Sequence, residues 1–197
     1  MTRFSRFGDA GQAFPIYIVV VAGLLFLAFA YLAVGQAAAN RNGAQTAADA
    51  AALAAALEAR DQLTEAWIEV ILDPAEWQDI LAGNGPVMDA CDRAYELAAL
   101  NDADAQCFWD DSLTVRVEAT TNKPVGESIV PGTEGKKSTE TARAVIEPRC
   151  GFDPPDEGAD DDVLPRLECE GQVWDLDPED LVDLPKPEDL FDVHLAD

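Results

Sequence analysis

The sequence predicts an α+β protein built on one long N-terminal helix, followed by short helices, a small antiparallel sheet and an acidic tail of low order. Three observations lead to this prediction: an apolar run without charge, an alanine-rich stretch that continues it, and two later segments that alternate apolar and polar residues. We expect four parts, which are a cytoplasmic N-terminus at 1–13, a transmembrane helix at 14–39, an external α+β domain at 40–150 and an acidic, proline-containing tail at 151–197.

The first element is an apolar segment long enough to cross a membrane. Residues 10–40 form 31 consecutive positions without a formal charge, and 16–34 are the centre of this run. A hydrocarbon core of about 30 Å needs roughly 20 apolar residues in a helix, so the length suffices. Arg3 and Arg6 precede the segment, and Arg41 is the only basic residue soon after it. The positive-inside rule therefore places the N-terminus in the cytoplasm and the remainder of the chain outside.

A cleaved signal peptide is the alternative interpretation of this segment. Ala37 and Ala39 form an A-x-A pattern that a signal peptidase could use. The apolar core is, however, longer than the roughly 7–15 residues usual in such signals. We therefore favour a retained anchor, with membrane lipid as its surroundings.

An alanine-rich stretch continues directly from the apolar segment. Ten of the nineteen residues from 43 to 61 are alanine, and 44–72 contains no proline or glycine. We expect one nearly continuous helix from residue 12 to about 72, with Asn42 and Gly43 as the place where a break is most expected.

Small side chains on one face of this helix allow another helix or a sheet to approach closely. The partner of the face is either a set of other membrane-anchored helices or the helix's own domain, and we expect the first. Asp49 is a possible polar contact. The alanines of this face are Ala44, Ala47, Ala48, Ala51, Ala52 and Ala55.

The segment GQAFPIYIVVVAGLLFLAFAYLAVGQAAANRNGAQTAADAAALAAA resembles the N-terminal module of TadE/TadG-like proteins of the tight-adherence (Flp) pilus-assembly systems of bacteria. In that module a glycine-led membrane helix is followed by a helical A-D-A-A-A-L-A tract, which residues 48–54 match here. The resemblance covers residues 8–57. It implies a membrane-anchored accessory or minor pilin-like component rather than an enzyme.

One departure favours the TadG-like branch of this family. Pilin-like members that a prepilin peptidase cleaves carry a glycine before the cut and a glutamate five residues after it. Here the fifth residue after Gly11 is Ile16, the fifth after Gly8 is Ala13, and the first glutamate is Glu58. The resemblance therefore implies an unprocessed protein that is anchored beside the assembly machinery.

Beyond the long helix, the sequence predicts two short helices and two half-buried strands. The helices are expected at 74–81, with Asp73 as its cap, and at 87–100. The strands are expected at 113–119 and, more weakly, at 141–146, because apolar and polar residues alternate there. The turn-rich sequence between the strands carries three of the four lysines.

Four cysteines all follow the apolar segment, and four cysteines allow three pairings. We predict the disulfides Cys91–Cys107 and Cys150–Cys169, because each closes a short loop. A metal site and free thiols are the alternatives, but the spacings of 16, 43 and 19 lack the close pairs of zinc sites. Disulfides suit a small core outside the cell.

The last 47 residues hold 17 acidic residues, two basic residues and six prolines, within a chain of formal net charge −25. This balance argues against nucleic acid or an anionic membrane surface as a partner, because attraction to phosphate needs lysine and arginine. The adjacent Asp160, Asp161 and Asp162 lack the spacing of a calcium loop. We expect a largely disordered tail, whose spaced apolar residues could instead dock on a partner or on the domain; these are Val173, Trp174, Leu176, Leu181, Leu184, Leu190, Phe191 and Leu195.

Nothing in the sequence indicates catalysis. The motifs of common hydrolases, nucleotide-binding proteins and metalloproteases are absent, and the single histidine is His194. We therefore expect no enzyme, no cofactor and no metal, but a membrane-anchored component of a tight-adherence pilus or a related secretion apparatus, whose partners are lipid and other pilus-assembly or pilin-like subunits. The alternative is a tethered extracytoplasmic binding or sensing module that acts through its acidic tail.

Overall fold

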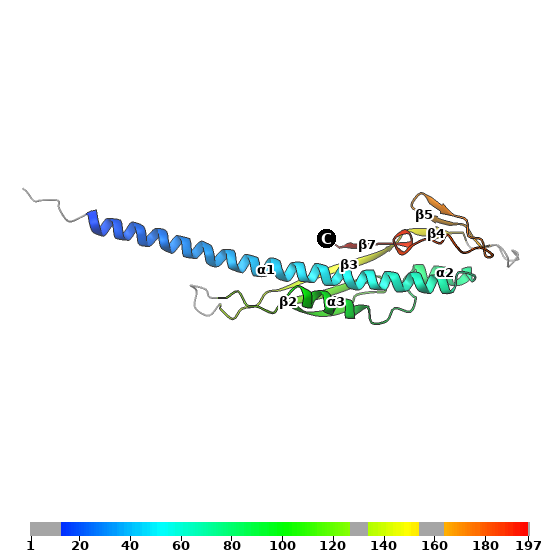
Figure 1. The fold of residues 1–197 in the computed structure, drawn as a ribbon, viewed down its shortest axis with the longest axis horizontal. Coiled ribbons are helices and arrows are strands. Elements are labelled where there is room, and N and C mark those ends of the chain that lie inside the picture. The colour runs from blue at the N-terminus through cyan, green and yellow to red at the C-terminus, as the bar shows by residue number, and fades with distance from the viewer. Residues whose placement is uncertain (1–12, 127–133, 154–163, 197) are drawn as a thin grey trace, which may run out of the picture.

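In the computed structural model, which describes residues 13–126, 134–153 and 164–196, one helix runs far beyond the domain that it supports. This helix, α1 (Ala13–Glu69), spans 57 residues. At about 1.5 Å per residue it is about 85 Å long. Its first half projects alone, whereas its second half carries every other element (Figure 1). The predicted α+β class with a long N-terminal helix is confirmed.

The helix continues without a break through Asn42 and Gly43, as the sequence predicts. A single glycine costs a helix only about 1 kcal/mol, and strong helix formers surround this one. The helix ends at Glu69, three residues before the expected end. A tight turn follows, in which the amide of Asp73 donates to the carbonyl of Val70 (2.8 Å).

Two short helices follow the turn. The first, α2 (Pro74–Leu81), has the predicted bounds, and the carboxylate of its cap Asp73 accepts from the amide of Ala75 at 3.3 Å. The second, α3 (Ala90–Leu100), begins three residues later than predicted. The side-chain amide of Gln62 donates to the carbonyl of Met88 and accepts from its amide, which holds the preceding residues outside the helix.

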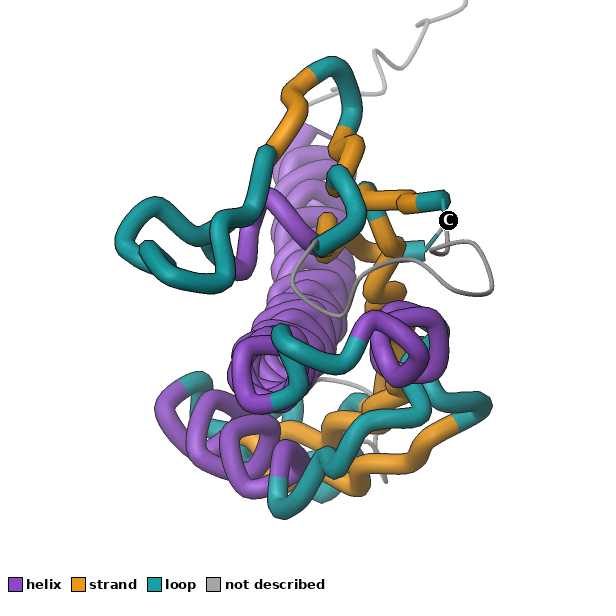
Figure 2. Tube along the Cα trace, turned by 90° about the vertical axis from the view of Figure 1, so that its right-hand side faces the viewer, coloured by secondary structure: helices purple, strands orange, loops and turns teal. Residues whose placement is uncertain are grey.

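The main sheet is antiparallel, with strand order β1-β2-β3-β7. Its strands are β1 (Ala103–Trp109), β2 (Thr114–Thr121), β3 (Thr139–Pro148) and β7 (Phe191–Leu195). The two predicted strands correspond to β2 and β3. Inward residues alternate with outward ones along β2, and its buried residues Val115, Val117 and Ala119 belong to the same core as the second half of α1. Figure 2, which looks nearly along α1, shows strands lying beside and beneath the helix.

A second, smaller sheet lies near the far end of α1 (Figure 1). It consists of β4 (Cys150–Phe152), β5 (Leu167–Cys169) and β6 (Gln172–Trp174) in that order, all antiparallel. A single turn, α4 (Pro187–Leu190), then leads the chain into β7.

The expectation of a low-order tail is wrong for residues 164–196. Leu190 and Phe191 are fully buried in the common core, and β7 is hydrogen-bonded to β3 within the main sheet. The apolar residues spaced through the acidic sequence provide enough burial to order it, so docking on the domain is what the structure shows. The acidic run of Asp160, Asp161 and Asp162 lies outside the described residues.

Candidate functional site

The first half of α1 is an exposed apolar surface. Large apolar side chains are exposed from Phe14 to Val34, and Leu25 at the centre is 54% exposed. A contiguous apolar surface of this size is not stable in water. By length and composition this helix could cross a membrane, and it is the one such helix in the described ranges. Arg3 and Arg6, which underlie the predicted orientation, lie outside the described residues.

The second half of α1 has the opposite character. All six alanines of the predicted packing face are fully buried, together with Ala56 and Ala59. All of these alanines except Ala44 belong to one core with residues of α3 and of the main sheet, and α1 contacts α3, β2, β3 and β7 directly. Small side chains let these elements approach the helix backbone closely. The face is therefore occupied by the chain's own domain, and the expectation that other membrane-anchored helices pack on it is corrected.

Asp49 lies at the edge of the alanine face and is only half-buried. Its carboxylate accepts a hydrogen bond of 2.7 Å from the side-chain amide of Gln45, one turn earlier on the same helix. The two side chains border a shallow hollow with Thr141 and Arg143 of β3 and the C-terminal end of β7. The polar contact that the sequence suggests is thus made within the chain.

The two halves meet at Asn40, which links α1 to the hairpin formed by β2 and β3. Its side-chain amide donates to the carbonyl oxygen of Lys123 (2.9 Å), and its side-chain oxygen accepts from the hydroxyl of Thr121 (3.2 Å). The amide of Ser138 in turn donates to the same hydroxyl (3.2 Å). Because side-chain bonds of this kind have directional geometry, they fix the level at which the domain begins along the helix.

Arg41 adds a charged contact to this junction, since its guanidinium pairs with the carboxylate of Glu140 in β3. Asn40, Thr121 and Glu140 were not identified by sequence reasoning, and Arg41 was used only for the orientation. One signal for this junction was present in the sequence. Asn40 ends the uncharged run, its side chain can both donate and accept hydrogen bonds, and the charged Arg41 follows it directly. Its partners lie 81 or more positions away.

Both predicted disulfides are present. Cys91–Cys107 joins α3 to β1, with a Cα–Cα distance of 5.8 Å. Cys150–Cys169 joins residues that lie opposite each other in β4 and β5. The two disulfides therefore hold α3 on β1 and β4 on β5. Within the described ranges no group of three histidine, cysteine or acidic side chains is arranged to hold a metal ion.

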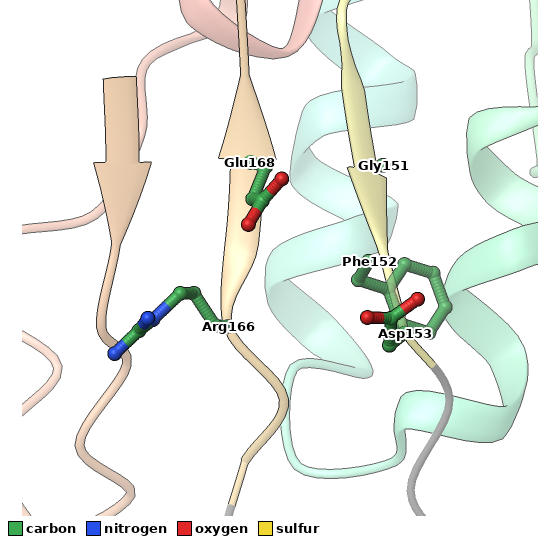
Figure 3. A pocket seen from close by; sticks show the side chains of 5 residues that line it. All are labelled: Gly151, Phe152, Asp153, Arg166 and Glu168. Atoms are coloured by element: carbon green, nitrogen blue, oxygen red, sulfur yellow. The ribbon is translucent and has the colours of Figure 1, made fainter. Parts of the chain in front are cut away.

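A hollow of about 570 Å³ lies on the small sheet (Figure 3). Its lining includes the carboxylates of Asp153 and Glu168 and the guanidinium of Arg166. Arg166 is already paired with Asp175 at 2.7 Å, and the figure shows its side chain directed away from the two carboxylates. The residues that line this hollow include no serine, threonine, cysteine, lysine or histidine.

Two groups of ion pairs on the surface connect segments of the two sheets. Asp110 accepts from Arg116 and from Arg143, both at 3.0 Å, and the bond from Arg116 is the main cause that holds the pKa of Asp110 below its usual 3.8. Arg149, between the two sheets, pairs with Glu170, which raises the pKa of the guanidinium. Both groups connect neighbouring strands and carry no sign of a binding site.

Comparison with known protein families matches the helix that these observations single out. Residues 11–60 fit the family model described as "Putative Flp pilus-assembly TadE/G-like". Comparisons with the curated proteins and with the solved structures give no match. The matched segment contains the apolar half, the junction at Asn40 and the entire alanine face. At residues 11–60, the chain is therefore similar to the Flp pilus-assembly TadE/G-like family.

Proposed function

We propose that this protein is a membrane-anchored accessory or structural component of a tight-adherence (Flp) type pilus or a related secretion apparatus, of the TadG-like branch. The observation that carries the proposal is α1, because the family match at 11–60 falls on the helix whose large apolar side chains are exposed before Asn40 and whose alanines are buried after it. The protein acts by holding a folded domain at the membrane.

In this proposal the N-terminus is cytoplasmic and the domain is extracytoplasmic. Arg3 and Arg6 support the orientation through the positive-inside rule. The two disulfides support the compartment, because disulfides persist outside the reducing cytosol. Protease added to intact cells or spheroplasts should therefore digest the domain and spare the N-terminus. Digestion of the N-terminus with a protected domain would contradict the orientation.

The partners in this proposal are membrane lipid and other pilus-assembly subunits. Since the alanine face is taken by the chain's own domain, other membrane-anchored helices would meet α1 along its apolar half. Leu32 is 56% exposed there, and the space around Gly35 is open. A photo-crosslinker at Leu32 should capture other subunits of the apparatus, whereas one at Ala52, which is fully buried, should form links only within the chain.

The second candidate function is a tethered binding module that acts through its acidic sequence. The observation in its favour is that residues 164–196 hold ten acidic and two basic residues, while few of these side chains contribute to the core. In this case α1 would serve only as a tether.

Complementation of a deletion strain tests the proposal and separates the two candidates. Deletion should abolish or reduce surface pili seen by electron microscopy, and the full chain should restore them. A chain whose residues 14–34 are replaced by an unrelated transmembrane helix should fail to restore pili if α1 makes specific contacts. Restoration by that chimera, combined with failure of a chain carrying Asp175→Asn and Asp177→Asn, would favour the binding module. Unchanged pili in the deletion strain would contradict the proposed function.

A further inference from the structure

The hairpin between β2 and β3 gathers basic side chains at the membrane end of the domain. Lys123, Lys136 and Lys137 are three of the four lysines in the chain, and Arg41 lies at the same end of the domain. All four side chains are exposed. Lys123 pairs with Asp102 at 3.1 Å and Arg41 pairs with Glu140, whereas neither Lys136 nor Lys137 forms an ion pair with an acidic group among the described residues.

The position of the hairpin along α1 follows from its hydrogen bonds. Asn40 holds the hairpin where β2 ends, and the amide of Val125 donates to the carbonyl of Lys136 at 2.8 Å, so the two arms remain paired beyond that point. Figure 1 shows the hairpin extending along α1 toward the apolar half. An extended chain rises about 3.3 Å per residue, so the four residues after Thr121 reach up to about 13 Å beyond the junction.

This reach is sufficient to bring the lysines to the headgroup layer of a membrane. If residues 16–34 fill the hydrocarbon core, the polar layer of about 5–7 Å on that side corresponds to the next four or five residues of α1, which end near Asn40. The paired arms of the hairpin lie beside this stretch. Lysine side chains at such a level can direct their ammonium groups to lipid phosphates.

Acidic and basic side chains are distributed unevenly along the length of the molecule. At the hairpin end four basic residues are balanced by four acidic ones, Asp102, Glu127, Glu134 and Glu140. Residues 164–196, which form β5 and β6 of the small sheet, α4 and β7, hold ten acidic and two basic residues. The strong negative charge that repels an anionic membrane surface is therefore concentrated in residues 164–196, while the hairpin end is close to neutral.

We propose that Lys136 and Lys137 bind the headgroups of anionic phospholipids and hold the β2–β3 hairpin on the outer membrane surface. This inference rests on the membrane anchoring in the proposed function. The domain would then contact the membrane at two places, through α1 and through the hairpin, with its acidic end pointing away.

A fluorescent label beside the lysines tests this proposal in the full chain. Gly135→Cys gives a labelling site with open space around it, and the four native cysteines are all in disulfides. The labelled chain is inserted into vesicles of phosphatidylcholine alone, or of equal parts phosphatidylcholine and phosphatidylglycerol. Both types also carry a trace of lipid with a nitroxide on its headgroup. A label at Val182→Cys, which is 82% exposed in the acidic region, is the control.

We expect stronger quenching of the Gly135→Cys label in the phosphatidylglycerol vesicles, weaker quenching at high salt, and little quenching of the control label. Each lysine near an anionic surface favours contact by about fivefold, so Lys136→Glu with Lys137→Glu should reduce the quenching at least twofold. Lys186→Glu, at the distant lysine, should leave it unchanged.

Three results would overturn the proposal in distinguishable ways. Inserted protein with an unquenched label would mean that the hairpin does not reach the surface, while the anchoring would stand. Quenching that is the same in both vesicle types and in the double variant would remove the role of the lysines. Protein that fails to float with either vesicle type would contradict the anchoring, and with it the proposed function.

Discussion

The two halves of α1 belong to one unbroken helix but are built from different side chains. Before Asn40 the exposed residues are large and apolar, and after it the buried residues are mostly alanine. Lipid is fluid and accommodates large side chains of any shape, whereas a sheet that packs on a helix needs the two backbones to come close. Side-chain size therefore distinguishes the half of the helix that could cross a membrane from the half that packs on protein, although both are apolar.

The largest effect is expected when a buried side chain that packs in the core on the alanine-rich half of α1 is removed. Phe191 in β7 is fully buried, so Phe191→Ala should lower the free energy of unfolding by about 3–5 kcal/mol. Chemical denaturation of the full chain in detergent micelles, followed by the fluorescence of the buried Trp67 and Trp77, measures this change. Val182→Ala, at an exposed position of the same acidic sequence, should change it by less than about 0.5 kcal/mol. Equal stabilities of the two variants would contradict the ordered C-terminal region.

A charged residue in the apolar half of α1 should weaken its insertion into a membrane without affecting the domain. Leu25 lies at the centre of the apolar run, and an arginine there should disfavour membrane insertion by about 3–4 kcal/mol. The fraction of protein that stays in membranes after alkaline extraction should fall for Leu25→Arg, while the unfolding of the domain stays the same. Leu72→Arg, at a position 62% exposed beside the domain, serves as the matched control and should stay in the membrane.

The same substitution placed in each half sharpens the comparison. Ala52 is fully buried against the domain, so Ala52→Leu should destabilise the domain by about 1–3 kcal/mol through overpacking. Ala28 is exposed in the apolar half, and Ala28→Leu should leave the denaturation midpoint unchanged. If both variants unfold like the parent protein, the alanine face is not packed as described.

The smallest effect is expected at the boundary. Asn40→Ala removes two side-chain hydrogen bonds to the hairpin, each worth about 0.5–1.5 kcal/mol, so it should lower the stability of the domain by about 1–2 kcal/mol. Hydrogen exchange of the amides of Thr121 and Asn122, which donate to the carbonyls of Ser138 and Asp102, should accelerate. Gln36→Ala, one turn earlier on the helix, is the control, and an equal acceleration there would argue against a specific junction.

Local patterns in the sequence were enough to predict α1, α2, β2 and β3. Helix length, the cap at Asp73 and the alternation in β2 are all properties of neighbouring residues. In contrast, β1 contains Ala103, Asp104 and Ala105, which have little preference for strands, and it forms because it pairs with β2. Such pairing depends on residues far away in the chain.

The acidic region could not be predicted from its composition. Composition described residues 151–197 as a tail, because acidic residues and prolines outnumber the apolar ones. Two apolar residues, Leu190 and Phe191, decide the outcome by filling a gap in the core and by bringing β7 to the edge of β3. Because Leu190 and Phe191 are part of the core, removing residues 152–197 would expose it. The junction at Asn40 could not be predicted either, because its hydrogen-bond partners are distant in the sequence.

The unbroken passage of α1 through Asn42 and Gly43 has a mechanical consequence. The 30 residues from Asn40 to Glu69 form an arm of about 44 Å that shares one axis with the apolar half. Transmembrane helices commonly tilt by about 20°, and a tilt of that size would sweep the far end of the arm sideways by about 15 Å. A neighbouring subunit that changes the inclination of the anchor would thereby swing the acidic end of the domain as a lever, without any hinge.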